Sequence, residues 1–144
     1  MRLALAQARQ AAAVGEVPIG AVAVLHNSVI GAGFNRKEQA HDPTAHAEMI
    51  ALRQAAEHLG NWRLERVTLY CTLEPCPMCA GAMLQARLKR LVWGAPDIRF
   101  GADGSVVELL KADGFNHRVS VQSGVLADEC GAMLTEFFRR QRSD

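Results

Sequence analysis

The chain has 144 residues, of which 49% are hydrophobic and 22% are charged, and it contains 5 prolines. This composition is typical of one folded domain and excludes disordered and fibrous proteins. The 16 lysines and arginines nearly balance the 15 acidic residues, and the resulting net charge of +1 excludes a uniformly basic surface. A nucleic-acid partner would therefore need a local basic patch.

The sequence also argues against a membrane protein and against a disulfide-stabilised one. No apolar run approaches the ~18 residues that a membrane span needs, and Arg and Gln interrupt the start of the chain, where a signal peptide would be apolar. The 4 cysteines are too few for a disulfide scaffold. We therefore expect a soluble, cytoplasmic protein without membrane contact.

The first half of the chain predicts a helix, a β-hairpin and a second helix. Leu3–Val14 is rich in alanine and ends at a glycine, which predicts an opening helix. Ala21–Leu25 and Val29–Phe34 flank a short polar turn and predict a hairpin. The next helix is expected to begin at Asp42, an N-cap residue followed by proline, and to end at Gly60.

The second half of the chain predicts a strand, a helix and a parallel strand, followed by shorter elements and a closing amphipathic helix. These expected elements are Val67–Thr72, a helix opening at Pro75, Leu91–Trp93, a short helix at Val106–Leu110, a strand at Val119–Val121 and the helix Ala127–Arg140. The predicted fold class is α/β, with three layers (α/β/α) in which a mostly buried sheet of about five strands carries helices on both faces.

Three residues at helix starts have the chemistry and spacing of metal ligands. Cys76 and Cys79 lie three apart at the start of one predicted helix, where the helix dipole favours their thiolates. By itself this Cys-x-x-Cys pair also fits a redox site. His46, in the first turn of another predicted helix, supplies a third ligand, and three ligands leave one tetrahedral position open, as in catalytic zinc sites.

A closed structural zinc site is the alternative, and it would need a fourth protein ligand. Cys71 and Cys130 are the remaining cysteines, and we expect each to be a small buried hydrophobic residue. Glu48, two residues after His46, would have a function beside an open zinc site. A carboxylate there can take a proton from a zinc-activated water and pass it to a substrate.

His46-Ala47-Glu48 together with Pro75-Cys76-Pro77-Met78-Cys79 resembles the signature of the zinc nucleoside and nucleobase deaminases. Further stretches make the whole chain similar to the bacterial tRNA-specific adenosine deaminases. They are Glu16 to Ala21, His41 to Glu48, Thr72 to Cys76, Met78 to Met83, Gly114 to Val119 and Leu126 to Cys130.

The resemblance implies the activity and the partners. Residues 1–144 would form a single zinc-dependent deaminase domain with one Zn²⁺ per subunit. The enzyme would convert the wobble adenosine (position 34) of a tRNA anticodon stem-loop to inosine, with release of ammonia. It would act as a homodimer and without a nucleotide cofactor.

The resemblance also assigns roles to individual residues. His46, Cys76 and Cys79 would bind the zinc ion, and Glu48 would transfer protons. The expected substrate contacts are Asn35, the backbone amide of Ala47, Asp97 at the ribose and the aromatic ring of Phe138. Phe138 is also compatible with a core position beside its neighbour Phe137.

The segment around Asp97 departs from the family pattern. Pro96, Ile98 and Phe100 stand where the family has other, mostly polar residues. Phe100 offers a ring on which an unpaired base could stack, although we expect it to cover the core.

Two other functions remain open on the sequence. The first is deamination of a free nucleobase or nucleoside of the cytosine or guanine type, and the second is a non-catalytic RNA-binding module stabilised by zinc. The basic end of the last predicted helix favours RNA over a small neutral substrate. Two groups of cations are candidate RNA contacts: Arg139, Arg140 and Arg142, and Arg87, Lys89 and Arg90.

Overall fold

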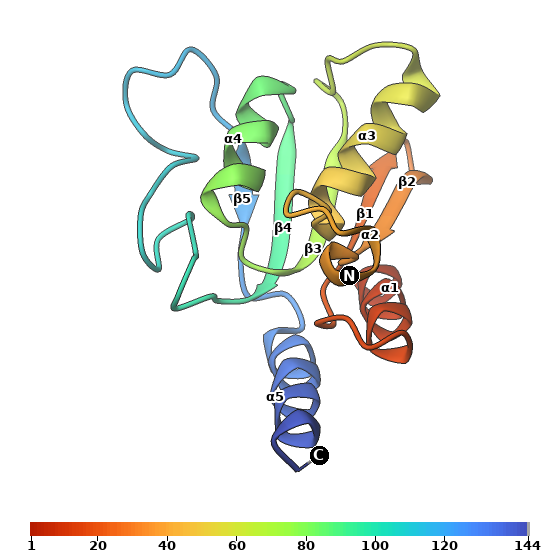
Figure 1. The fold of residues 1–144 in the computed structure, drawn as a ribbon. Helices are drawn as coiled ribbons and strands as arrows, with labels where there is room; N and C mark the ends of the chain where they lie inside the picture. Colours follow the sequence, from red (N-terminus) through yellow and green to blue (C-terminus); the bar gives the residue numbers. More distant parts are fainter. Residues whose placement is uncertain (144) are drawn as a thin grey trace.

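The computed structural model describes residues 1–143, which form a five-stranded mixed sheet with strand order β2-β1-β3-β4-β5 (Figure 1). β1 pairs antiparallel with both β2 and β3, whereas β3, β4 and β5 run parallel. The predicted α/β class and the sheet of five strands are therefore confirmed. The strands are β1 (Gly20–Leu25), β2 (Ser28–Phe34), β3 (Thr68–Leu73), β4 (Arg90–Ala95) and β5 (Ser120–Gln122).

Helices cover both faces of the sheet, as predicted. Glycines show where the helices approach most closely. A Cβ atom on Gly33 of β2 would lie 2.8 Å from the Ala47 carbonyl oxygen of α3, and one on Gly20 of β1 would lie 2.1 Å from the Ala4 carbonyl oxygen of α1. The helices are α1 (Arg2–Ala13), α2 (Lys37–Ala40), α3 (Ala47–Leu59), α4 (Pro77–Gln85) and α5 (Ala127–Ser143).

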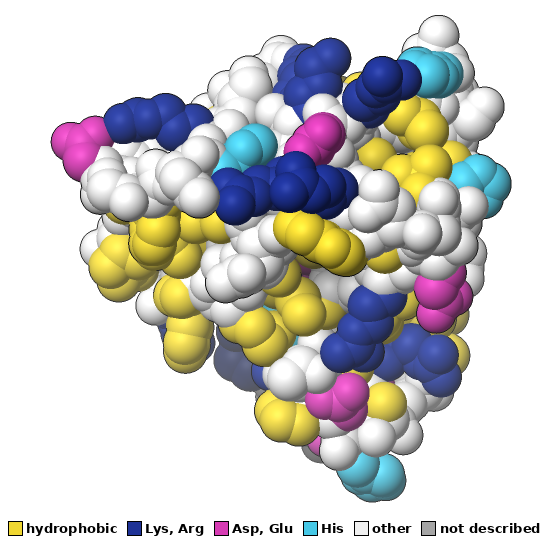
Figure 2. All heavy atoms as spheres, turned by 90° about the horizontal axis from the view of Figure 1, so that it is seen from above, with side chains coloured by type: hydrophobic (Ala, Val, Ile, Leu, Met, Phe, Trp, Pro, Cys, Tyr) yellow, Lys and Arg dark blue, Asp and Glu magenta, His cyan; other side chains and the backbone are white. Residues whose placement is uncertain are grey.

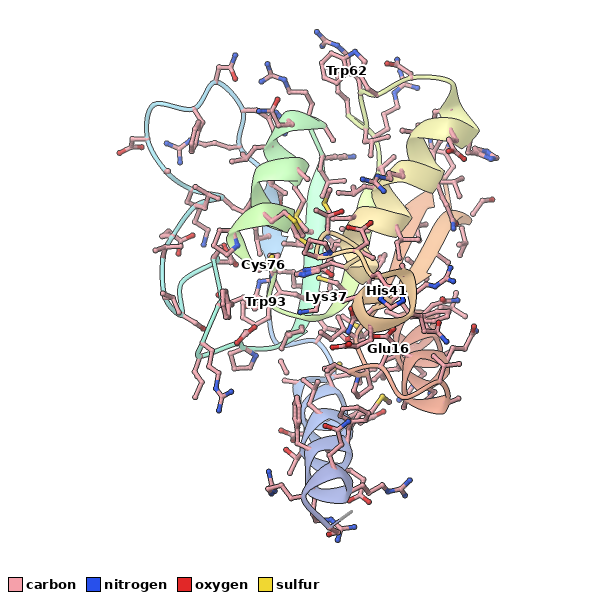
Figure 3. All side chains as sticks on the ribbon, viewed as in Figure 1. Glu16, Lys37, His41, Trp62, Cys76 and Trp93 are labelled. Carbon is pink, nitrogen blue, oxygen red and sulfur yellow. The ribbon has the colours of Figure 1, made fainter. Side chains whose placement is uncertain are left out.

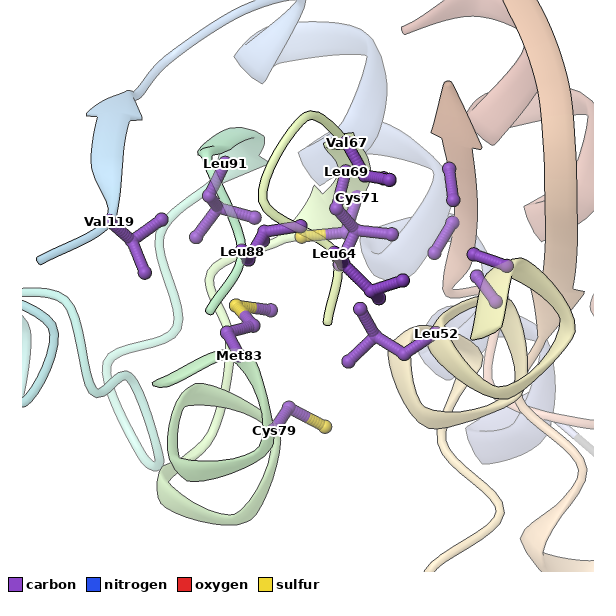
Figure 4. Packing of buried hydrophobic residues seen from close by; sticks show 14 of the residues in the cluster. Leu52, Leu64, Val67, Leu69, Cys71, Cys79, Met83, Leu88, Leu91 and Val119 are labelled. Carbon is purple, nitrogen blue, oxygen red and sulfur yellow. The ribbon is translucent and has the colours of Figure 1, made fainter. Parts of the chain in front are cut away.

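The main core lies between the sheet and the helices α3 and α4 (Figure 4). Leu69 of β3 and Leu91 of β4 are fully buried there against Met83 of α4 and Leu52 of α3. Burial of each such side chain contributes about 1.5–3 kcal/mol. This packing fixes the relative position of α3 and α4. The predicted metal ligands lie at the starts of these two helices.

Two predicted helices differ from the structure. The helix expected to begin at Asp42 begins at Ala47, because the Asp42 carboxylate accepts hydrogen bonds from the Thr44 N–H (2.8 Å) and hydroxyl (2.7 Å) and closes a turn instead. The short helix expected at Val106–Leu110 is absent from the described residues. There the N–H groups of Val106 and Leu109 donate to the carbonyls of residues 101 and 102 rather than along a helix.

The short helix α2 was not predicted. The buried carboxylate of Glu16 accepts hydrogen bonds from the N–H groups of Glu38 (3.1 Å) and Gln39 (2.7 Å) and so caps its start. Between residues 1 and 143, no helix combines the length and the apolar character that a bilayer crossing requires.

Candidate active site

His46 and Cys76 occupy equivalent positions at the starts of two helices. His46 is the N-cap residue of α3 and Cys76 that of α4, and both have an extended backbone, with ψ of 151° and 170°. Neither side chain caps its own helix. Both side chains therefore project beyond the helix ends, and Pro77 starts α4 without a backbone N–H to satisfy.

The three predicted ligands converge on one point. The His46 Nδ1 atom lies 3.5 Å from the Cys76 Sγ atom and 3.5 Å from the Cys79 Sγ atom, and all ligand atoms of the group lie within 4.8 Å of one another. Zinc–ligand bonds of about 2.0–2.3 Å at tetrahedral angles place neighbouring ligand atoms about 3.5 Å apart. The geometry of this group, which we call the metal cluster, therefore fits a tetrahedral metal ion.

The two thiols of the metal cluster form a hydrogen bond that shifts their pKa values in opposite directions. A hydrogen bond from the Cys79 thiol, together with one from His46, lowers the pKa of Cys76 to about 4. The pKa of Cys79 is raised well above its usual range, first because Cys79 is the donor to Cys76 and second because it is buried. The cluster thus holds one thiolate, and a cation bound there would favour a second.

Glu48 lies in the first turn of α3, and its side chain is 4% exposed. Burial is the main cause that raises its pKa to about 7, and nearby His46 opposes that shift. A carboxyl group with a pKa near neutrality both accepts and donates protons under physiological conditions. Glu48 therefore has the properties of a general acid and base.

His46 and Cys76 of the metal cluster line a pocket of about 480 Å³ together with Glu48, a size in the range of small-molecule sites, whereas Cys79 is buried behind them. Asn35, Ala47 and Asp97 line the same pocket, so the structure brings three of the four predicted substrate contacts to the cluster. The wall also contains residues to which the sequence analysis assigned no role in the site: Val17, Ile19, Lys37, Pro43, Leu73, Glu74, Pro77 and Met78.

Asn35 is 3% exposed and is held in place by its neighbours. Its side-chain amide donates to the Val17 carbonyl (3.3 Å), and its side-chain oxygen accepts from the Lys37 N–H (3.3 Å). Each of its polar atoms keeps bonding capacity for a ligand, because an amide offers two donors and two acceptor sites.

Asp97 begins a loop that forms another part of the pocket wall and that we call the rim loop, residues 97–105. Its carboxylate accepts hydrogen bonds from the N–H groups of Arg99 (3.0 Å) and Phe100 (3.2 Å), which turns the chain sharply. Phe100 lines the pocket and is 65% exposed. The expectation that Phe100 covers the core was therefore wrong.

Phe138 does not line the pocket. It lies on α5, is 42% exposed and makes an edge-to-face contact with Phe137, with ring centroids 5.4 Å apart. α5 runs away from the sheet, so the far end of this helix projects into solvent (Figure 1). Within one chain, Phe138 is separate from the metal cluster.

The two groups of cations lie on different parts of the molecule. Arg139 and Arg140 on α5 are exposed and both pair with Glu136 (2.8 and 2.9 Å), which lowers the pKa of that carboxyl to about 2. Lys89 and Arg90 stand at the amino end of β4, whereas the metal cluster follows the carboxyl end of β3. Figure 2 shows lysine and arginine side chains at several separate places on the face seen from above, with hydrophobic and uncharged side chains between them.

Cys71 and Cys130 are buried and lie outside the metal cluster. The Cys71 thiol donates to the Leu73 carbonyl (3.2 Å), and the Cys130 sulfur fills the space beside Gly94, where a Cβ atom would lie 2.5 Å from it. Neither can close the site as a fourth ligand, and both are packed as the sequence predicted. Between residues 1 and 143, no other group of His, Cys or acidic side chains has metal-ligand geometry.

The chain is similar to known proteins over almost its whole length. The family profile of MafB19-like deaminases matches residues 1–142. The tRNA-specific adenosine deaminases of Bacillus subtilis and Haemophilus influenzae are 48% and 50% identical to the chain over 99% and 100% of its length, covering 88% and 84% of those proteins.

Solved structures give the same result. A structure from a study of A-to-I editing by tRNA:A34 deaminases superposes with a TM-score of 0.89 at 46% identity, and the match covers 93% of this chain and 97% of that one. A guanine deaminase from Nitrosomonas europaea is more distant, with a TM-score of 0.78 at 26% identity over 94% of this chain and 81% of that one. Because the matches span nearly the whole chain, it belongs to the MafB19-like deaminases and, within them, to the family of the tRNA-specific adenosine deaminases.

Proposed function

We propose that the protein is a zinc-dependent hydrolase that deaminates the wobble adenosine, position 34, of a tRNA anticodon stem-loop to inosine. The observation that carries this proposal is the pocket that Glu48 lines together with His46 and Cys76 of the metal cluster, in a chain about half identical to named tRNA-specific adenosine deaminases. The whole of residues 1–144 would act as one deaminase domain.

His46, Cys76 and Cys79 would hold one zinc ion per subunit, and this ion would lower the pKa of the attacking water to about 7. Glu48 then takes a proton from the attacking water and delivers it to the purine ring nitrogen. The water oxygen adds to C6 as a hydroxyl group. Glu48 then takes the proton of this hydroxyl and passes it to the amino group, which leaves as the C6–N bond breaks and the C6 carbonyl forms. The products are inosine and ammonia, so atoms and charges balance.

The pocket walls would bind the flipped adenosine. The N–H of Ala47 is the first of α3 and has no partner within the helix, so it is available to the base. Asn35 contacts the nucleoside through its amide, and Asp97 accepts a hydrogen bond from the ribose 2′-hydroxyl. Phe138 lies outside the pocket of its own chain, and its contact with substrate depends on RNA that extends past the pocket along α5.

We propose further that the enzyme is a homodimer and works in the cytoplasm. The cytoplasm holds its tRNA substrate, and its reducing conditions keep Cys76 and Cys79 as free thiols for metal binding.

The substrate that yields ammonia distinguishes this function from its nearest alternative, the deamination of free guanine. The protein should release ammonia from a stem-loop that carries adenosine at position 34 and not from guanine, cytosine or their nucleosides. Turnover of a free base at a comparable kcat/KM would favour the alternative.

Binding of the stem-loop should depend on salt through the cations of α5. Each phosphate neutralised on single-stranded RNA contributes about −0.7 to the slope of log affinity against log salt. Replacement of Arg139, Arg140 and Arg142 by Gln should therefore flatten the slope by about two, if all three contact phosphate. The matched control replaces Arg87, Lys89 and Arg90, at the other end of the sheet, and should leave the slope unchanged. The opposite pattern would move the RNA to that second group.

Asp97→Asn should narrow the preference for RNA over DNA. The 2′-hydroxyl distinguishes the two nucleic acids, and an amide oxygen accepts its hydrogen bond less strongly than a carboxylate. The measurement compares kcat/KM for RNA and DNA versions of one hairpin. Phe100→Ala is the control, because loss of a stacking ring should weaken both substrates alike. An unchanged RNA preference in Asp97→Asn would remove Asp97 from ribose recognition.

A further inference from the structure

The buried carboxylate of Glu74 holds the rim loop. Glu74 directly follows β3, is 1% exposed and stands two residues before Cys76. One carboxylate oxygen accepts hydrogen bonds from the Asp97 N–H (3.1 Å) and the Ser105 hydroxyl, and the other accepts from the N–H groups of Asp103 (2.9 Å) and Ser105 (3.1 Å). One side chain thus ties both ends of the rim loop to the segment that carries a predicted metal ligand.

The middle of the rim loop also packs directly on this segment. Gly101 passes so close to Glu74 that a Cβ atom there would lie 2.4 Å from a carboxylate oxygen. The next residue, Ala102, donates its N–H to the Pro75 carbonyl (2.8 Å). The rim loop therefore has little freedom to shift relative to the strand end.

The Glu74 carboxylate accepts four hydrogen bonds from the rim loop. The two carboxylate oxygens of Glu74 accept two hydrogen bonds each, three from N–H groups and one from a hydroxyl. Hydrogen bonds to an ionised carboxylate are shorter and stronger than those between neutral groups. The Glu74 carboxylate therefore holds the rim loop firmly in one position.

We propose that Glu74 is a positioning residue that sets where Asp97 and Phe100 stand relative to the metal cluster, and so controls how tightly substrate binds. The inference rests on the proposed function. Because Glu74 holds the Asp97 N–H, and the Asp97 carboxylate in turn holds the Phe100 N–H, a displaced rim loop moves both pocket side chains. Glu48 lies on α3, outside the rim loop, so the proton-transfer step keeps its geometry.

The chain contains a spectroscopic reporter for this loop. The Trp93 indole N–H donates to the Asp103 carboxylate (2.8 Å), and the Asp103 N–H is held by Glu74. The only other tryptophan, Trp62, lies on the surface well away from Trp93 and Cys76 (Figure 3). In a Trp62→Phe background, tryptophan fluorescence therefore reports the rim loop.

The test is Glu74→Gln in that background. Gln keeps the size of Glu, but its amide nitrogen cannot accept the hydrogen bonds of one carboxylate oxygen. We expect KM for the stem-loop to rise about tenfold or more, because each lost bond to a charged group is worth roughly that factor. The expected kcat stays within about threefold of the parent value. Trp93 emission should shift, and zinc content should stay at the parent level.

A glycine variant probes the same contact from the rim loop. Gly101→Ala should push the rim loop away from an intact Glu74 carboxylate and reproduce both the rise in KM and the emission shift. Gly81→Ala is the matched control, because a Cβ atom at this position of α4 meets nothing within 4 Å. If Glu74→Gln does not fold, Gly101→Ala decides the question.

A merely structural role for Glu74 predicts another result. Fewer folded molecules would lower the apparent kcat and leave KM unchanged, and that outcome would overturn the proposal. An emission shift with both constants unchanged would overturn it as well. If the parent protein acts on a free base instead of the stem-loop, the proposed function fails on its own, and the same comparison of KM and kcat with that base decides the role of Glu74.

Discussion

Glu48→Gln is expected to lose roughly 10²–10⁴-fold in kcat, because a positioned proton-transfer group contributes about that much to a rate. Glu48 moves at least two protons in the proposed reaction, so the loss should lie toward the upper end. Gln keeps the shape of the buried side chain, and the fold and the zinc content should stay unchanged. The measurement is the single-turnover rate of inosine formation in the stem-loop.

Glu57→Gln is the matched control for this prediction. Glu57 lies on the same helix, α3, but its side chain is exposed and outside the pocket. The control should keep the parent rate. A Glu48→Gln enzyme that retains its zinc and turns over at a near-parental rate would rule out Glu48 as the proton carrier.

Cys79→Ala is expected to abolish both stoichiometric zinc binding and activity. Removal of this fully buried sulfur leaves His46 and Cys76, and two ligands do not make a stable zinc site. Metal analysis of freshly purified protein measures the first effect and inosine formation the second. Cys130→Ala is the control, since it also removes a buried thiol but lies outside the metal cluster, and it should keep both properties.

Full zinc content in Cys79→Ala would refute the ligand set. Chelation of the parent protein separates a catalytic zinc from a structural one. The core between the sheet and helices α3 and α4 is built from hydrophobic side chains, so the protein should lose activity on chelation before it loses its fold. Unfolding on chelation would support the alternative of a zinc-stabilised binding module.

Local patterns in the sequence predicted most of the fold. The hairpin prediction came from two apolar runs around a short polar turn, and the structure shows a tight turn in which His26 and Asn27 both adopt positive φ, 48° and 64°. The helix predicted to open at Pro75 is also present as α4, which begins two residues later, at Pro77, with Cys76 as its N-cap residue. Local chemistry decided these elements, so the sequence was enough.

Predictions of helices failed where other hydrogen bonds replace the expected helical ones and so determine the backbone conformation. Asp42 is a good helix-capping residue, but its carboxylate closes a turn with Thr44, and the later start of α3 leaves His46 extended at the cap position. The helix expected at Val106–Leu110 is replaced by bonds back to residues 101 and 102. Asp caps helices and closes turns equally well, so the residue type of Asp42 did not distinguish the two outcomes.

The candidate site was likewise predicted only in part. The motifs around His46 and Cys76 predicted a group that the structure does bring together. The hydrogen bonds of Glu74 could not be predicted, because all four donors lie more than twenty residues further along the chain, the nearest of them 23 residues away at Asp97. The sequence held one indication of a special role for Glu74. It is a charged residue directly between an apolar strand and Pro75-Cys76, and the fold buries it.

The most direct test of the proposed function is the nucleoside composition of a synthetic tRNA anticodon stem-loop with adenosine at position 34 after incubation with the zinc-loaded protein. We predict that inosine replaces adenosine at position 34 and at no other adenosine, with one ammonia released per inosine, and that Glu48→Gln gives no inosine on the same time scale. An unmodified stem-loop in the presence of fully zinc-loaded, folded protein would contradict the assignment.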